Sequence, residues 1–331
     1  MNKNEIECIF CKTESNHVVI EENGYQGKKC LQCGLIYISP RPAFDEIVDI
    51  YGHDNAHISA EAHISADFLK RLYAKHNLRI ICSAIKSGEL LEIGAGAGYF
   101  LDEARKMGFN PYGLEFNPIQ ANHIRNKLNI PCEESSFTTS VFDGKQFDVV
   151  YHCDVISHFF EPISDFRKIN EKMKDGSFLI FETGNLGEVD QIYFKYYKLF
   201  QYPDHLFFFR TDNIIDLLEK TGFELVKMHR YSILPQLAVI KALSVARKLI
   251  IGHILKPNKK EEHRSEKSSV DILSATGSQS FDVESFVKKS VRYVYQYIMY
   301  LLRYKIGRIA PNAGRPQTVI FVARKRRQSD L

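Results

Sequence analysis

Apolar runs and amphipathic stretches alternate along the chain between residues 89 and 230, and this pattern predicts strands and helices in turn. Short apolar runs predict strands over residues 89–94, 111–115, 129–133, 147–153, 177–183 and 223–230. Apolar residues at helical spacing predict the intervening helices, over residues 98–108, 117–128, 162–173 and 211–221. Strands that alternate with helices form one mostly parallel sheet covered on both faces, so the predicted fold class is α/β and doubly wound.

Helical periodicity also flanks this region. Before it, residues 68–85 carry apolar side chains at helical spacing. After it, two longer apolar stretches, 233–255 and 283–309, predict helices that contain too many basic residues to cross a bilayer. The charged, serine-rich composition of residues 257–280, between these two helices, predicts a mobile linker.

Three glycines at alternate positions, Gly94, Gly96 and Gly98, follow the strand predicted at 89–94. Glycine permits a tight turn and a close approach of the backbone to a ligand, and the next helix presents unpaired N–H groups there. The spacing differs from the G-x-G-x-x-G of dinucleotide folds, and the Lys-Ser/Thr of a phosphate loop is missing. Glu115 ends the next strand, where a carboxylate can accept both hydroxyls of a ribose. The alternative for Glu115 is a surface position after a buried strand.

The pattern E-x-G-x-G-x-G, which starts at Glu92 and is followed by Glu115, resembles the first motif of class I S-adenosylmethionine (SAM)-dependent methyltransferases. The resemblance implies a seven-stranded Rossmann-like sheet in which the last strand, within 317–325, inserts antiparallel beside the fifth. Residues 89–231 and 317–325 would then form the SAM-binding domain, and residues 232–316 would be a helical insertion before the last strand. The cofactor-binding residues implied are Glu92, Gly94, Gly96, Gly98, Glu115, Phe116, Ser135 and Asp154.

Two Cys-x-x-Cys pairs, Cys8–Cys11 and Cys30–Cys33, characterise the first 42 residues. This spacing is typical of a zinc ribbon, in which four thiolates hold one tetrahedral ion and leave no open position for substrate. The segment between the pairs contains an Asn-Gly turn and predicts a hairpin. A redox-active pair is the alternative, but it needs a single Cys-x-x-Cys at the start of a helix. We therefore expect a structural zinc in an N-terminal domain, residues 1–42.

Residues 43–88 are predicted to be a linker and an N-terminal helix. Within them, residues 56–66 contain Ala-His-Ile-Ser-Ala twice, which is too short to be a solenoid repeat. The spacing of the three histidines His53, His57 and His63 favours a loop or helix over a metal site.

Candidate catalytic residues follow two later elements. Asp154 and His158, after the fourth strand, resemble the aspartate and histidine that many small-molecule methyltransferases carry there. Asp204 and His205 resemble the Glu-His-x-x-Tyr-Phe-Ser region of zinc-bearing sugar C-methyltransferases, with Asp204 in place of the Glu. The resemblance implies that the acceptor is a small molecule, such as a nucleotide sugar or another cell-surface glycan precursor. Either His205, oriented by Asp204, or His158 could take a proton near pH 7, and either could instead be structural.

Charge limits the classes of partner. A formal net charge of +4 gives no broad phosphate-binding surface, and no Asn/Asp-Pro-Pro-Tyr/Phe segment follows the fourth strand, so a nucleic-acid methyltransferase is disfavoured. A non-catalytic scaffold on the same fold is the other alternative, and the intact glycine pattern argues against it. The start of the chain has no apolar segment like that of a signal peptide, so we expect a cytoplasmic protein.

The role of the insertion is left open between two interpretations. Its basic residues and tyrosines, with the basic tail 326–331, could contact an anionic membrane surface peripherally. Alternatively, the two helices pack against the catalytic domain as a lid or form a dimer contact. The sequence does not indicate the oligomeric state.

Overall fold

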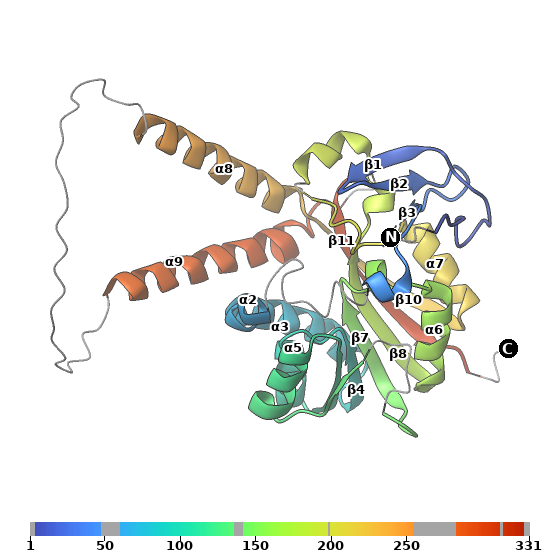
Figure 1. Cartoon of the computed structure of the whole chain (residues 1–331). Helices are drawn as coiled ribbons and strands as arrows, with labels where there is room; N and C mark the ends of the chain where they lie inside the picture. Colours follow the sequence, from blue (N-terminus) through green and yellow to red (C-terminus); the bar gives the residue numbers. More distant parts are fainter. Residues whose placement is uncertain are drawn as a thin grey trace.

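The computed structural model describes residues 4–47, 60–135, 142–197, 199–254, 283–311 and 314–327. These residues form two sheets with their helices and a pair of long helices that projects from them (Figure 1). The predicted mobile linker 257–280, His53, His57 and the last residues of the basic tail lie outside the described residues.

The larger sheet has seven strands in the order β10-β11-β8-β7-β4-β5-β6. Their bounds are β4 Gly88–Ile93, β5 Phe109–Glu115, β6 Cys132–Glu134, β7 Phe147–Cys153, β8 Met173–Gly184, β10 Phe223–Ser232 and β11 Gln317–Lys325. Strands β4 to β8 are parallel, and β11 lies antiparallel between β8 and β10. The predicted α/β sheet and the placement of its last strand are confirmed. Strand order reverses at β4, so the carboxyl ends of β4 and β7 border the crevice where such sheets bind ligands.

Helices cover both faces of this sheet. Their bounds are α2 Ala60–Ser65, α3 Asp67–Ala84, α4 Tyr99–Lys106, α5 Pro118–His123, α6 Pro162–Glu171 and α7 Thr211–Lys220. Neighbouring residues of a strand point to opposite faces. Thus Val149 packs in the core formed with α3 and α4, whereas Val150 packs in the core formed with α6 and α7. The helix predicted over 117–128 is α5 continued by a π-helical turn, η1 Ile124–Leu128.

A smaller sheet joins the N-terminal segment to the catalytic part of the chain. Its order is β1-β2-β3-β9, with β1 Val18–Glu22, β2 Tyr25–Lys29, β3 Ile36–Ile38 and β9 Phe207–Phe208. Asn23 and Gly24 connect β1 to β2 with φ of 53° and 77°, the positive angles that a two-residue hairpin turn requires. Because β9 pairs with β3, the sheet of the N-terminal domain includes a strand from the segment that follows His205.

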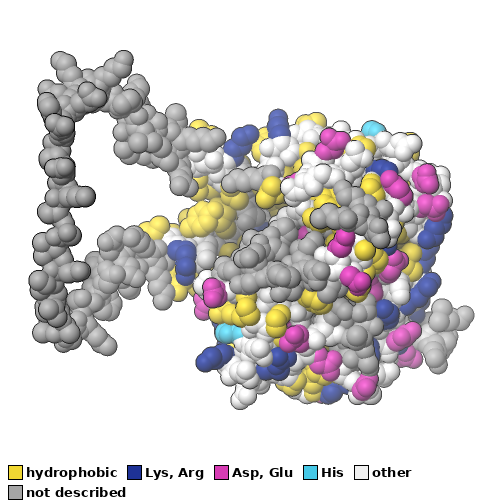
Figure 2. All heavy atoms as spheres, in the orientation of Figure 1, with side chains coloured by type: hydrophobic (Ala, Val, Ile, Leu, Met, Phe, Trp, Pro, Cys, Tyr) yellow, Lys and Arg dark blue, Asp and Glu magenta, His cyan; other side chains and the backbone are white. Residues whose placement is uncertain are grey.

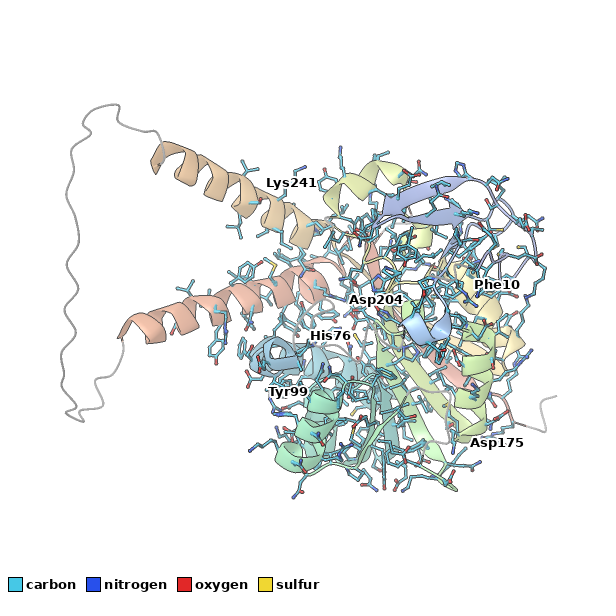
Figure 3. The ribbon with its side chains drawn as sticks, in the orientation of Figure 1. Phe10, His76, Tyr99, Asp175, Asp204 and Lys241 are labelled. Atoms are coloured by element: carbon cyan, nitrogen blue, oxygen red, sulfur yellow. The ribbon has the colours of Figure 1, made fainter. Side chains whose placement is uncertain are left out.

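The insertion forms a projecting arm, which we define as α8 Leu234–Ile254, α9 Val283–Tyr300 and the π-helical turn η5 Leu301–Ile306. The root of the arm, residues 299–306, is packed: Tyr304 is buried, and its ring stacks on His76 of α3 with the centroids 3.9 Å apart. Figure 3 labels His76 on α3. Farther out, the two helices leave the body of the protein (Figure 1). The insertion thus contacts the catalytic domain through α3, and its role as a lid, a dimer contact or a membrane contact stays a prediction. No described helix is both long enough and apolar enough to cross a membrane.

Candidate active site

The glycine corner joins β4 to α4. Gly94, Gly96 and Gly98 have φ of 69°, 54° and 76°, in the left-handed region that favours glycine. A Cβ atom on Gly94 would lie 2.7 Å from Cγ2 of Val155, and one on Gly98 would lie 2.6 Å from Cγ1 of Ile124. Larger residues at these two positions would force the loop away from its neighbours.

Glu115, at the end of β5, forms a hydrogen bond with the glycine corner. Its carboxylate accepts hydrogen bonds from the backbone N–H of Gly96, at 2.6 Å, and of Asn117, at 2.9 Å. Asn117 caps α5 by accepting from the N–H of Ile119, which fixes the turn after Glu115. Burial raises the pKa of Glu115 despite these bonds. Each oxygen of a carboxylate can accept a second hydrogen bond, so the group can also receive ribose hydroxyls.

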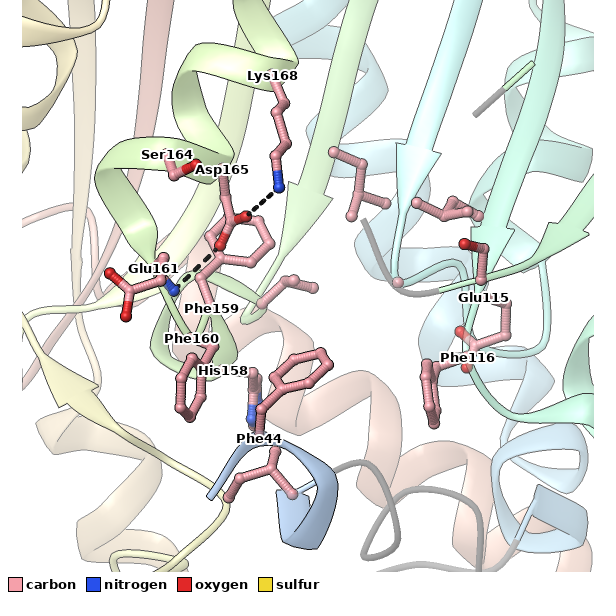
Figure 4. A pocket seen from close by; sticks show the side chains of 16 residues that line it. Phe44, Glu115, Phe116, His158, Phe159, Phe160, Glu161, Ser164, Asp165 and Lys168 are labelled. Atoms are coloured by element: carbon pink, nitrogen blue, oxygen red, sulfur yellow. Dashed lines mark hydrogen bonds and ion pairs between the residues drawn. The ribbon is translucent and has the colours of Figure 1, made fainter. Parts of the chain in front are cut away.

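A cavity of about 530 Å³ opens beside Glu115. Phe116 and Ser135 line it, together with Gly94. Figure 4 shows Glu115 and Phe116 on one wall, and Phe44, His158 and Phe160 on the other. The cavity lies within the size range of small-molecule sites.

A second cavity, of about 370 Å³, lies against the same glycine corner, and Gly94 lines both cavities. Glu92 lines the second cavity and is buried, and its Oε2 has no hydrogen-bond partner among the described residues. Burial, and then the charge of Glu115, raise its pKa well above the ordinary value. A buried carboxylate oxygen without a partner is costly, and a ligand that donates a hydrogen bond would remove that cost.

Arg303, from the root of the arm, also lines this second cavity. Its Nη2 lies 2.5 Å from Oε1 of Glu182, a fully buried carboxylate that also accepts from the hydroxyl of Tyr304 at 2.8 Å. The Nε of Arg303 is buried without a partner among the described residues. The insertion thus places the cation Arg303 beside the glycine corner, although the two are far apart in the sequence.

A third cavity, of about 490 Å³, brings together the candidate catalytic residues. Asp154, His158, Asp204 and His205 all line it. Asp154 also lines the second cavity and His158 also lines the first, so the three cavities meet at the carboxyl end of β7. The remaining wall contains rings and polar side chains, among them Tyr197, Phe200, Phe208, Thr183, Asn185 and Gln201.

A carboxylate–histidine contact forms part of the wall of this cavity. Nδ1 of His158 is 3.1 Å from Oδ1 of Asp204 and 3.2 Å from the Asp204 carbonyl oxygen. Both partners accept, so Nδ1 carries a hydrogen and Nε2 is the nitrogen that can take up a proton. Nδ1 of His205 contacts the carbonyl oxygen of Phe200 at 3.0 Å, and the two histidine rings lie 4.6 Å apart. Asp204 therefore reaches a histidine that is distant from it in the sequence.

The environment of His158 changes its pKa in two opposite ways. Burial alone would lower the pKa, because it disfavours the charged imidazolium. The hydrogen bond and the charge of Asp204 outweigh burial and raise the pKa above its ordinary 6.5. The imidazole is therefore a stronger base than an exposed histidine.

The N-terminal domain holds the segment that carries Asp204 and His205. The Glu22 carboxylate, at the end of β1, accepts from the N–H of Phe200 at 2.9 Å and of Tyr202 at 2.7 Å. The β3–β9 pairing holds the other end of the segment. The position of Asp204 thus depends on the N-terminal sheet.

The four cysteines of the N-terminal domain converge. The ligand atoms of Cys8, Cys11, Cys30 and Cys33 lie within 4.8 Å of one another, and the Sγ atoms of Cys8 and Cys33 are 3.5 Å apart. Tetrahedral zinc with Zn–S bonds of about 2.3 Å needs sulfurs roughly 3.8 Å apart, whereas a disulfide needs about 2.05 Å. Burial, and then contacts with the neighbouring thiols, raise the pKa of Cys11 to about 11, an effect that a bound cation would reverse. The donor set fits zinc.

Sequence reasoning missed two residues of the site. Arg303 was not singled out among the basic residues of the two predicted helices, and His63, which lines the second and third cavities, was not expected to take part. A basic residue that falls among buried tyrosines near the end of a helix could have indicated Arg303. Nothing in the repeated segment distinguishes His63 from His57.

Comparison with known proteins gives a matching family, a relative of similar sequence and solved structures of similar fold. Residues 60–228 match the family described as Methyltransferase domain. A ubiquinone biosynthesis O-methyltransferase of Ruegeria pomeroyi is 28% identical over 101 residues, which are 29% of this chain and 41% of that protein. The match therefore spans less than half of that relative.

Two solved structures are similar at lower identity. Phosphoethanolamine N-methyltransferase 2 of Haemonchus contortus, in complex with SAM, is 14% identical with a TM-score of 0.48, over 88% of this chain and 62% of that one. Coclaurine N-methyltransferase, bound to N-methylheliamine and SAH, is 14% identical with a TM-score of 0.43, over 85% of this chain and 81% of that one.

Proposed function

Because the chain belongs to the methyltransferase-domain family, we propose that it transfers the methyl group of SAM to a small-molecule acceptor bound beside His158. The observation that carries this proposal is the meeting of three cavities at Gly94, Asp154 and His158. Two of them border the glycine corner and suit the two halves of the cofactor. The third contains a histidine whose pKa is raised by a carboxylate, and suits the acceptor.

The residues around the glycine corner fit SAM. Glu115 can accept the ribose hydroxyls, and Phe116 can contact the adenine. In the second cavity, the carboxylate of Glu92 can accept from the ammonium group of the methionine moiety, and Arg303 can donate to its carboxylate. SAM, when bound, supplies a methyl group activated by a positively charged sulfur.

His158 is the general base in this proposal. Its Nε2 takes the proton of the acceptor, while Asp204 holds Nδ1 and stabilises the imidazolium that forms. His205 lies close enough to orient the acceptor. Aromatic rings and amide side chains in the same cavity suit the faces and hydroxyls of a sugar, so we propose a nucleotide sugar or another glycan precursor as the acceptor class.

The pH dependence of turnover tests the pairing of Asp204 with His158. A general base must be neutral, so kcat/KM is expected to rise as pH increases through the raised pKa of His158. In Asp204→Asn the charge and the carboxylate hydrogen bond of Asp204, the main influences that raise the pKa of His158, are removed while burial remains. The rise of kcat/KM with pH should therefore move to lower pH, while the rate falls. The assay is methyl transfer from labelled SAM to nucleotide sugars and lipid-linked glycan precursors. An unchanged acidic limb in Asp204→Asn would show that His158 is not the titrating base.

A structural zinc in the cysteine cluster is the second part of the proposal. Metal analysis should give about one zinc per chain, since four thiolates make a closed tetrahedral site. Cys8→Ser with Cys33→Ser should remove the metal and reduce turnover, because the N-terminal sheet holds the Asp204 segment. SAM affinity should change little, because the glycine corner lies outside that sheet.

The matched control is Cys82→Ser, a thiol outside the cluster, which should keep both zinc and activity. Purified protein that is free of metal and yet fully folded and active would exclude the zinc.

A further inference from the structure

The arm presents apolar side chains to solvent. Val291 and Val294 of α9 are 64% and 60% exposed, and Leu243 of α8 is 51% exposed. Figure 2 shows hydrophobic side chains gathered where the two helices leave the body, with basic side chains beside them. Large apolar groups grouped on an exposed helix pair indicate an interaction surface.

The charge of the arm has one sign. The sequence of α8 contains no acidic residue, and that of α9 and η5 contains a single one, Glu284. The basic residues in the sequences of these elements are Lys241, Arg247, Lys248, Lys288, Lys289, Arg292, Arg303 and Lys305. Among the basic residues with described side chains, Lys241, Arg292 and Lys305 are exposed. Two copies of such a surface would repel each other, whereas an anionic surface would attract it.

The arm begins beside the acceptor cavity. Ile233, the residue before α8, lines that cavity, and Nζ of Lys241 lies 4.6 Å from the centroid of the Tyr196 ring. Tyr196 ends the short helix η4 Gln191–Tyr196. Just beyond it, Leu199 lines the same cavity and is 64% exposed. Exposed apolar side chains thus occur both on the arm and at the rim of the cavity.

We propose that the arm binds the surface of an anionic lipid bilayer. Its apolar side chains enter the interface between headgroups and acyl chains, and its basic side chains contact lipid phosphates, as in other amphipathic helices that lie in a membrane surface. Neither helix crosses the bilayer. Because α8 starts at the acceptor cavity, docking sets the rim of this cavity against the membrane. The binding does not depend on the proposed methyl transfer.

Co-sedimentation of the full chain with vesicles tests this proposal. Vesicles with about one-third phosphatidylglycerol in phosphatidylcholine should bind the protein, and pure phosphatidylcholine should bind it much less. A Lys or Arg near an anionic surface contributes about fivefold to binding, so Lys241→Glu with Arg292→Glu should weaken it by roughly thirtyfold or more. A separate variant, Val291→Ser with Val294→Ser, should weaken binding to the same vesicles without changing the charge.

The matched control reverses two exposed lysines of the body, Lys86→Glu with Lys127→Glu, and keeps the same net charge as the arm variant. This control should bind nearly as well as the unaltered chain. Absence of binding to anionic vesicles, equal losses in the arm and body variants, or dimerisation through the arm without lipid binding would each overturn the proposal. Circular dichroism of each variant separates lost binding from lost folding.

Discussion

His158→Gln is expected to lower the rate of methyl transfer by about 10²–10⁴, the usual contribution of a positioned general base. Glutamine can fill much of the same space and donate to Asp204, but it cannot take a proton. The cofactor is held mainly by residues of the glycine corner, so the affinity for SAM should stay nearly unchanged. Single-turnover transfer from labelled SAM, with the affinity measured separately, checks both parts.

Two further histidine variants make this test specific. His17→Gln alters an exposed histidine of the N-terminal domain and should keep full activity. His205→Gln should reduce turnover less than His158→Gln does, since His205 is given the role of orienting the acceptor. Full turnover in His158→Gln, or a larger loss in His205→Gln, would show that His158 is not the general base.

Glu115→Ala is expected to weaken SAM binding by about 2–4 kcal/mol, which is roughly 30- to 1000-fold. The change removes the charged acceptor for the ribose hydroxyls and also releases the N–H of Gly96 that Glu115 holds at 2.6 Å. Both effects act on the cofactor, so calorimetric titration with SAM is the appropriate measurement.

The control for this prediction is Glu134→Ala, an exposed acid at the end of the neighbouring strand β6. It alters the same charge close to the same edge of the sheet but lines none of the three cavities. SAM affinity should therefore be unchanged. Equal losses in the two variants would mean that general charge, and not the position of Glu115, governs the affinity.

The order of strands and helices was predictable because hydrophobic periodicity is a local property. Strand β7 has the predicted bounds, and the left-handed angles at the three glycines agree with the reason given for their presence. β8 is longer than predicted, since it begins at Met173, before the most apolar part of the strand. The predicted class of protein is confirmed by the family match.

Contacts between distant segments were not predictable in the same way. Asp204 was expected to act on its neighbour His205, but its carboxylate bonds His158, which lies 46 positions away along the chain. Arg303 reaches the glycine corner because η5 packs on α3, and no local pattern encodes that packing. Glu22 accepts a hydrogen bond from the N–H of Phe200, 178 positions away along the chain. The pairing of β3 with β9 brings these two segments together.

Titration of the unaltered chain with SAM tests the proposed cofactor site most directly. If the cavities at the glycine corner hold SAM, calorimetry will show about one SAM bound per chain, S-adenosylhomocysteine will compete with it, and Glu115→Ala will weaken it. Absence of binding in a folded, zinc-loaded preparation, or binding that Glu115→Ala leaves intact, would contradict the assignment.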